Sequence, residues 1–145
     1  MAAVQHTAPE PYFQALMAGR ATTPPCAETL GITILTHDPA THTVELEFEG
    51  RPEFANPIGN VQGGFLAAML DDAMGLASAS AMSVAEFSPT LALTVHFHRP
   101  AAIGKIQGTG RIAMRGRKTV QLSGELRQNG KLVATATSAA IIRKV

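Results

Sequence analysis

The chain has 145 residues, a net charge of +1 and a hydrophobic fraction of 46%. This length fits one domain, and the balanced charge argues against a dedicated nucleic-acid binder or a membrane-surface protein. The single cysteine, Cys26, cannot form an intramolecular disulfide, and the first residues lack the basic start and apolar run of a signal peptide. We therefore expect a cytoplasmic protein.

The N-terminal third predicts a short helix followed by a hairpin. PYFQALMAG (residues 11–19) can form an amphipathic helix with Phe13, Leu16 and Met17 on one side, and ATTPPCAET (21–29) is interpreted as a linker. GITILTHD and HTVELEFEG flank a turn-like PAT and predict two paired strands, because apolar and polar residues alternate in the second of them.

The middle of the chain predicts one long buried helix. Residues 63–82 are apolar enough to raise the question of a membrane span, but two acids interrupt them at the centre and strand-like segments surround them. Four more strands follow: TLALTVHFHRP, GKIQGTGRIAMRG, KTVQLSGELRQ and GKLVATATSAAIIRKV. The order predicts a single α+β domain over residues 1–145, in which a curled antiparallel sheet of about six strands wraps around the helix.

The start of the long helix carries the first chemical signal. Asn60, Val61 and Gln62 lead into Gly63 and Gly64. The first N–H groups of a helix have no partners within it, and glycine lets a ligand approach the backbone closely. The pair is therefore a candidate donor site for a carbonyl oxygen or an oxyanion. The alternative, that the glycines only permit tight helix–sheet packing, fits the pattern equally well.

Two adjacent acids, Asp71 and Asp72, carry the second signal. Asp71 lies eight positions after Gly63, about 12 Å further along a helix and about 80° around it. A carboxylate that acts on a carbonyl held at Gly63 must lie within a few ångströms of it. If the two groups cooperate, the acid must come from a second copy of the chain. Adjacent helical residues diverge by about 100°, so only one acid shares a given environment, and we interpret Asp72 as structural.

These segments together resemble a known family. Asn56 with VQGGFLAAMLDDAMG, then TLALTVHFHRPA, then GRK and GELRQNGKLVATAT, is similar to the hotdog-fold acyl-CoA thioesterases of the phenylacetate-pathway (PaaI-like) type, within the 4-hydroxybenzoyl-CoA thioesterase superfamily. The resemblance runs from about residue 30 to residue 142. Matched to the family motif, the site residues are Asn56, Gln62, Gly63 and Asp71, and Thr90 stands where relatives carry Ser or Thr.

The resemblance implies hydrolysis of an acyl-CoA or aryl-CoA thioester across a homodimer or homotetramer interface. The Gly63 N–H would polarise the carbonyl, Asp71 of the partner subunit would serve as general base or nucleophile, and Thr90 would orient it. Asn56 would position the water or the leaving sulfur. Gln62 replaces the family histidine and would orient the substrate, because an amide donates and accepts hydrogen bonds without transferring protons.

The remaining candidates concern the substrate's coenzyme A. Gly64 would help to bind the substrate, and Arg115, Arg117 and Lys118 are candidates for its phosphates, although a plain charged turn explains them nearly as well. No cofactor and no metal are expected, since His96 and His98 lack a third ligand at suitable spacing. Two alternatives stay open: a noncatalytic acyl-CoA-binding protein, and, less favoured, a hydratase or dehydratase, which would be expected to carry a catalytic histidine.

Overall fold

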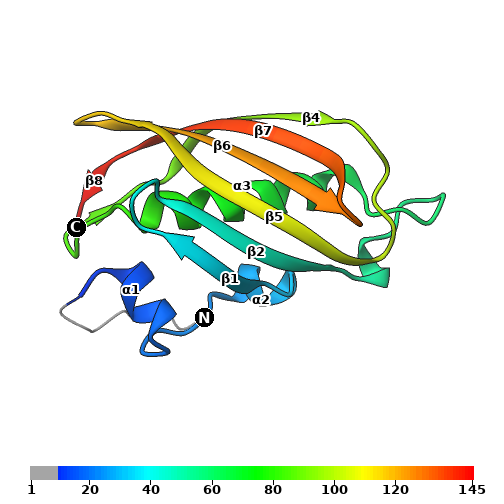
Figure 1. The fold of residues 1–145 in the computed structure, drawn as a ribbon, viewed down its shortest axis with the longest axis horizontal. Helices are drawn as coiled ribbons and strands as arrows, with labels where there is room; N and C mark the ends of the chain where they lie inside the picture. Colours follow the sequence, from blue (N-terminus) through cyan, green and yellow to red (C-terminus); the bar gives the residue numbers. More distant parts are fainter. Residues whose placement is uncertain (1–9) are drawn as a thin grey trace.

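The computed structural model describes residues 10–145 as a curved sheet folded around one helix (Figure 1). The N-terminal elements are α1 (Tyr12–Met17), α2 (Pro25–Thr29), β1 (Thr33–Asp38), β2 (Thr43–Gly50) and a 3-10 turn at Pro52–Phe54. The central elements are α3 (Gly63–Ala79), β3 (Glu86–Phe87) and β4 (Thr90–Phe97). The C-terminal strands are β5 (Gly104–Arg115), β6 (Thr119–Gln128), β7 (Lys131–Ile141) and β8 (Arg143–Lys144).

Six strands form one antiparallel sheet in the order β1-β2-β5-β6-β7-β4. The predicted α+β architecture is confirmed, including six long strands around one helix. The next strand of this sheet after α3 in the chain, β4, lies at its far edge beside β7. Its other side therefore faces no strand within residues 10–145.

The core lies between α3 and the concave face of the sheet. Met69, Leu70, Ala73 and Met74 of the helix are fully buried against strand residues such as Phe48, Leu46, Ile106 and Leu126. The helix approaches β5 so closely that a side chain at Gly110 would overlap the carbonyl of Ala73. Glycine at this position therefore fixes how deeply α3 sits in the sheet, and with it the place of the helix residues that carry the site.

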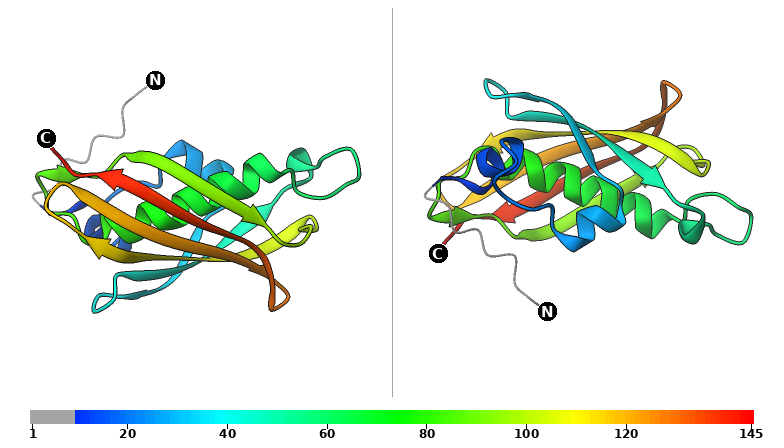
Figure 2. Two further views of the ribbon diagram at one scale, coloured as in Figure 1. Left: turned by 90° about the horizontal axis from the view of Figure 1, so that it is seen from above. Right: turned by 90° about the horizontal axis from the view of Figure 1, so that it is seen from below.

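The N-terminal segment covers the side of α3 that the sheet leaves open (Figure 2). Phe13 and Ala15 of α1 are buried, as the predicted amphipathic helix requires, but Met17 is about half exposed. The predicted linker contains a helix, α2, that starts with Pro25 at its first position, where proline's missing N–H is no loss. The interpretation of residues 21–29 as a plain linker was wrong in that part.

The two-residue strands β3 and β8 pair with each other. Strand β3 was not predicted, because so short a segment has no periodicity, and the last predicted strand (130–145) divides into β7 and β8. Within residues 10–145, no helix is long and apolar enough to cross a membrane.

Candidate active site

Asn56 organises the loop that leads into α3. Its side-chain oxygen accepts hydrogen bonds from the backbone N–H groups of Ile58 and Asn60, at 3.1 and 3.0 Å. Its backbone N–H donates to the carbonyl of Asn60 at 2.7 Å. The Nδ2 group of Asn56 has no acceptor among the described residues. One end of this side chain thus builds the loop, while the other is available to a ligand.

Gln62 is the N-cap of α3. Its Oε1 accepts the Gly64 N–H at 2.7 Å, and a side chain at Gly64 would collide with that same oxygen. Glutamine at this position therefore satisfies one of the unpaired donors at the helix start. The N–H of Gly63 has no acceptor within residues 10–145, so it remains a free donor at the positive end of the helix.

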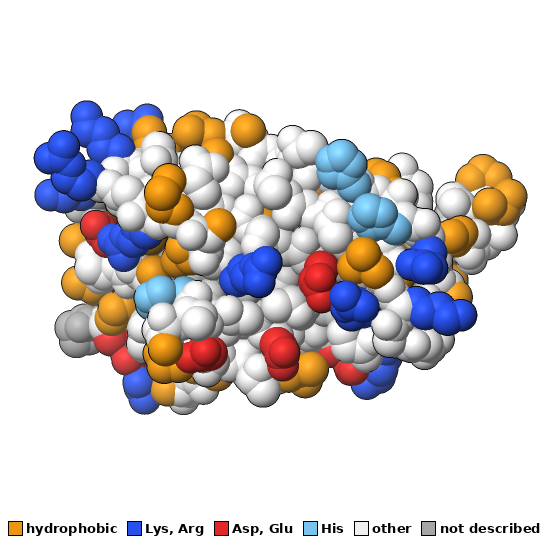
Figure 3. All heavy atoms as spheres, turned by 45° about the horizontal axis from the view of Figure 1, so that its top comes forward, with side chains coloured by type: hydrophobic (Ala, Val, Ile, Leu, Met, Phe, Trp, Pro, Cys, Tyr) orange, Lys and Arg blue, Asp and Glu red, His pale blue; other side chains and the backbone are white. Residues whose placement is uncertain are grey.

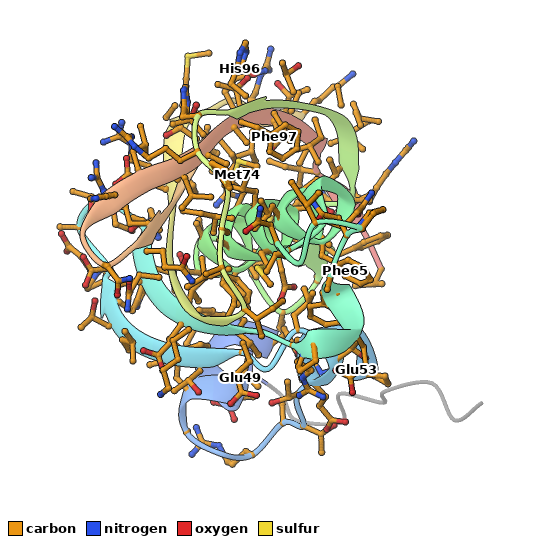
Figure 4. All side chains as sticks on the ribbon, turned by 90° about the vertical axis from the view of Figure 1, so that its right-hand side faces the viewer. Glu49, Glu53, Phe65, Met74, His96 and Phe97 are labelled. Carbon is orange, nitrogen blue, oxygen red and sulfur yellow. The ribbon has the colours of Figure 1, made fainter. Side chains whose placement is uncertain are left out.

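Asn56 and Gly63 share one groove at this end of the molecule. The groove has a volume of about 330 Å³, and Leu66, Phe97 and Pro100 also line it. Phe97, the last residue of β4, packs on Gly63 so closely that a Cβ there would lie 3.2 Å from the ring. In Figure 4, Phe97 lies on the α3 side of the sheet and His96 points outward. The structure thus brings together the two candidates that the sequence placed seven residues apart.

Asp71 meets Thr90 at the opposite end of β4. The Thr90 hydroxyl donates to Asp71 Oδ1 at 2.9 Å, which leaves Oδ2 without a hydrogen-bond partner among the described residues. The pairing of β4 with β7 shifts register between Thr90 and Ala92, as in a β-bulge. A bulge re-aims the side chains next to it, and this one accounts for a threonine that points inward although it precedes the outward-facing Ala92. The bulge therefore sets the contact between Thr90 and the carboxylate.

The two halves of the predicted site are separated within one chain. Gly63 and Asp71 are about 12 Å apart along α3, because each residue adds about 1.5 Å. β4 runs antiparallel to the helix, so that Phe97 contacts Gly63 and Thr90 contacts Asp71. The donor and the acid, both on α3, thus lie beside opposite ends of β4, the free edge strand.

Asp72 has an environment unlike that of its neighbour. Its Oδ2 atom is buried and has no hydrogen-bond partner among the described residues. Burial, reinforced by the nearby charge of Asp71, raises the pKa of Asp72 to about 6. The interpretation of Asp72 as merely structural gives no reason for a buried, unpaired carboxyl oxygen.

The three basic candidates differ in whether their side chains are already engaged within the chain. Arg115 is engaged with the backbone carbonyl of Ala81 and, at 3.0 Å, with Glu86. Arg117 and Lys118 are exposed in the β5–β6 turn. The Lys118 carbonyl accepts the N–H of Ile142, which places the turn beside β8 and its exposed residues Arg143 and Lys144.

These four exposed cations form one group, which we call the basic end: Arg117, Lys118, Arg143 and Lys144. Figure 3 shows Lys and Arg side chains gathered at the end of the molecule that carries β8. The Ile141 N–H bonds to the Pro89 carbonyl at 3.1 Å, so the basic end adjoins the strand start that carries Thr90. The sequence reasoning missed Arg143 and Lys144, because their nearness to the turn depends on strand pairing.

No group of three or more metal-ligating side chains occurs in the part of the chain that the structure describes. His98 is paired with the Thr135 hydroxyl at 2.8 Å. His96 lies on the outer face of the sheet.

Comparisons with known proteins identify the family of the chain. Residues 58–135 match the model of the family described as the thioesterase superfamily. The chain belongs to the thioesterase superfamily. Among curated protein sequences, none matches the chain. The matched segment starts in the Asn56 loop and ends in β7, so it includes the helix start, both acids and the whole of β4.

Solved structures of this superfamily are similar to the chain over most of its length. A phenylacetic acid degradation-related protein and candidate thioesterase from Ralstonia eutropha JMP134 is 39% identical, with a TM-score of 0.88 over 90% of this chain and 98% of its own. A mutant of the phenylacetic acid degradation protein PaaI from Thermus thermophilus is 26% identical, with a TM-score of 0.73 over 81% and 98%. The Escherichia coli PaaI protein, at 24% identity and a TM-score of 0.71 over 80% and 86%, shares the fold. Thus the predicted resemblance to PaaI-like hotdog thioesterases is confirmed, and it supports a thioester hydrolase.

Proposed function

We propose that this chain hydrolyses acyl-CoA thioesters to a carboxylic acid and CoA, in a homodimer whose two subunits share each site. Family membership supports thioester hydrolysis, and the names of the relatives from phenylacetic acid degradation favour aryl-acyl groups as substrates. We propose in addition that the substrate is a coenzyme A ester and that the named residues have the roles given below.

One observation carries the shared site: donor and acid lie at opposite ends of a free edge strand. If the β4 strands of two copies pair antiparallel about a centre at Thr94, Leu91 of one copy lies opposite Phe97 of the other, with Thr90 next to Leu91. The Asp71–Thr90 pair of one subunit then faces Gly63 and Asn56 of its partner. Two identical sites follow from this single two-fold axis.

The exposed side chains of β4 support such pairing. Leu91 and Phe97 are 62% and 55% exposed in the single chain, while Leu93 and Val95 between them pack on the core. A free strand edge with exposed apolar side chains is a template for pairing with another chain.

In the proposed reaction, the thioester carbonyl oxygen accepts the Gly63 N–H. Asp71 of the partner subunit, held through Oδ1 by Thr90, takes a proton from water with Oδ2 as the water oxygen attacks the carbonyl carbon. The carbonyl π electrons move onto the oxygen, where a donor at a helix N-terminus stabilises the charge. As the intermediate collapses, the oxygen electron pair re-forms the C=O bond and the C–S bond breaks. The sulfur leaves with the electron pair of that bond and takes up the proton that Asp71 removed from water, which gives CoA. Direct attack by Asp71 would instead give an acyl anhydride that water then cleaves.

The other residues support these steps. Asn56 Nδ2 donates to the water or to the leaving sulfur, while its oxygen keeps the loop in place. Gln62 fixes the helix start by capping Gly64, and Gly64 leaves room for that cap. The basic end, at the Thr90 side of the site, offers exposed cations to the phosphates of coenzyme A, whereas Arg115 is already committed to Glu86.

A hybrid dimer tests the shared site. Asp71→Asn keeps the size of the side chain and removes the base, so kcat should fall at least a hundredfold. Asn56→Asp keeps the loop-building oxygen and removes the donor. Differently tagged chains of the two variants are co-expressed, the hybrid is purified, and release of CoA is followed with a thiol reagent.

A shared site predicts that each hybrid holds one doubly damaged site and one intact site, with about half the wild-type activity per dimer. A hybrid as inactive as its parents would place both residues in one chain's site and overturn the arrangement. Glu125→Gln, at a half-buried acid on the sheet that pairs with Arg127, is the matched control and should retain full activity. Wild-type protein that binds CoA esters without releasing thiol would favour the noncatalytic alternative.

A further inference from the structure

The loop that leads into α3 carries an exposed apolar side chain, Ile58, which is 80% exposed. The loop itself is closed by hydrogen bonds. The N–H groups of Ile58 and Asn60 donate to the Asn56 side chain, and the Gly59 N–H donates to the Asn56 carbonyl at 2.9 Å. Both views of Figure 2 show the loop projecting beyond the sheet, at the end of the molecule opposite β8. Residues 56–60, which we call the tip loop, therefore present Ile58 on a preformed projection.

An apolar hollow of about 330 Å³ lies at the other end of the free edge strand, beside the segment that enters β4. Phe87 and Pro89 line it from this segment, and Gly75 and Ala79 line it from α3. Phe87 is 47% exposed in the single chain. A neighbouring cavity of about 340 Å³, lined by Asp72, shares the two α3 residues with the hollow.

The polar side chains that residues 83–88 bring to this hollow are engaged within the chain. Glu86 accepts the Ser83 N–H at 3.1 Å and pairs with Arg115 at 3.0 Å. The Ser88 hydroxyl is hydrogen-bonded to that of Ser78 at 2.7 Å. The hollow therefore suits an apolar side chain better than a charged one.

The tip loop and the hollow meet when two copies associate through β4. Each α3 runs antiparallel to its own β4, so antiparallel pairing of the two strands also sets the two helices antiparallel. Gly63 of one subunit then lies beside Asp71 of the other. Residues before Gly63 continue in the direction of the partner's residues after Asp71, toward Gly75, which is about 6 Å further along that helix. Ile58, five positions before Gly63, therefore reaches the partner's hollow.

We propose that Ile58 of each subunit packs into the hollow of its partner and is a positioning residue of the shared site. The inference rests on the proposed thioesterase function and its two-subunit site. Ile58 is two residues from Asn56, and Pro89 directly precedes Thr90, whose hydroxyl holds Asp71. The contact therefore joins the donor half of each site to its acid half. A single exposed apolar residue is common on a protein surface, so the matching hollow on the two-fold-related copy carries the inference.

Crosslinking tests the contact without relying on activity. In a Cys26→Ser background, Ile58→Cys and Phe87→Cys are combined in one chain, and the protein is treated with a short bismaleimide. The two positions lie toward opposite ends of β4 within one chain, so a crosslink between them joins two subunits. We expect covalent dimers on a denaturing gel, at least tenfold more than with either cysteine alone.

The matched control for crosslinking combines Leu35→Cys with Phe87→Cys. Leu35 is also exposed, at 51%, but lies on β1 at the opposite edge of the sheet. This pair should give no more covalent dimer than a single cysteine.

Kinetics measures the positioning role. Ile58→Ser removes an apolar side chain that the single chain leaves exposed, so the fold should be unchanged in thermal unfolding. We expect the dimer dissociation constant to rise at least tenfold, because each dimer loses two buried apolar contacts. At concentrations that keep the variant dimeric, kcat for phenylacetyl-CoA should fall at least tenfold with KM changed less than threefold, since small displacements of reacting groups slow the reaction.

Two further variants separate positioning from a general effect of substitution. Ile58→Leu keeps an apolar side chain of the same size and should retain kcat within threefold of wild type. Leu35→Ser makes the same kind of change at the opposite edge and should leave kcat and the dimer dissociation constant at their wild-type values.

The results separate this contact from the proposed function. Wild-type protein that releases no CoA from phenylacetyl-CoA contradicts the function, whereas the crosslink reports the contact independently. An active dimer in which the Ile58–Phe87 pair crosslinks no better than the Leu35–Phe87 pair overturns the contact and keeps the function. So does Ile58→Ser with wild-type kcat and dimer stability. If Phe87→Ser raises KM at least tenfold while Ile58→Ser has no effect, the hollow holds substrate instead of the partner's Ile58.

Discussion

Two neighbouring acids on α3 illustrate how one residue step changes the role of a carboxylate. Asp71 is half-buried and accepts the Thr90 hydroxyl, with one oxygen left for water. Asp72, about 100° around the helix, has one buried oxygen without a hydrogen-bond partner among the described residues. The difference comes from what covers each face, β4 for Asp71 and the N-terminal segment for Asp72.

The raised pKa of Asp72 predicts a pH-dependent stability. Because the folded state holds this proton up to about pH 6 and the unfolded state releases it near pH 3.8, the free energy of unfolding should fall as pH rises between these values. Asp72→Asn lacks the titration. Its stability relative to wild type should increase from pH 4 to pH 7.5, by at most about 3 kcal/mol for a shift of about two units.

Urea unfolding of both proteins at equal protein concentration measures this difference, and the other titrating groups largely cancel in it. A difference that stays constant across the range would show that Asp72 is not desolvated as described.

Gln62 allows a prediction about the family's histidine. Since Gln62 holds the helix start through Oε1 and needs no proton transfer to do so, Gln62→His should change kcat by no more than about tenfold, or about 1.4 kcal/mol. Steady-state kinetics with phenylacetyl-CoA provides the measurement. A thousandfold gain would instead indicate that the natural chain is a binder or an impaired enzyme.

At the scale of elements, a few close backbone contacts fix the position of α3 against the sheet. Gly110 on β5 meets the Ala73 carbonyl, whereas Gly75 on the same helix faces open space. We expect Gly110→Ala to destabilise the fold by roughly 1–3 kcal/mol through overpacking. Gly75→Ala should stabilise it by up to about 1 kcal/mol, since alanine is the better helix former.

The denaturant midpoints of Gly110→Ala and Gly75→Ala are compared. Both variants add one methyl group, but only the one at Gly110 meets the Ala73 carbonyl, so the difference reports that close approach. Equal and small shifts for both would mean that α3 does not sit as deep in the sheet as Gly110 implies.

The sequence predicted the long elements because their patterns extend over many residues. Alternation of apolar and polar residues marked β2, and the apolar run from Gly63 marked α3. Helix α2 escaped prediction because Pro24 and Pro25 indicate a linker as readily as a helix start. The site residues followed from family spacing, but three facts depend on tertiary contacts and could not be predicted: the engagement of Arg115 by Glu86, the two cations of β8 beside the turn, and the cavity around Asp72.

At the scale of the whole molecule, a single chain does not bring the donor and the acid of the proposed site together. The Gly63 donor and the Asp71 acid lie too far apart to act on one carbonyl, and the strand that joins them has an open edge. The basic end adjoins the Thr90 side of this edge. Association through β4 would therefore complete the site and bring the cations of one subunit near a substrate bound to its partner.

The last prediction concerns this edge. Leu91 on β4 and Met114 on β5 are exposed to nearly the same extent, 62% and 64%, but only Leu91 lies on the free edge strand. A lysine in place of Leu91 puts a charge where the partner's apolar side chains would pack, a device that proteins use to block edge pairing. We expect Leu91→Lys to shift the protein to monomers in sedimentation equilibrium and to lose thioesterase activity in proportion to the loss of dimers. Met114→Lys adds the same charge elsewhere and should remain dimeric and active. If Leu91→Lys stays fully active as a monomer, the site is complete within one chain and the β4 pairing is wrong.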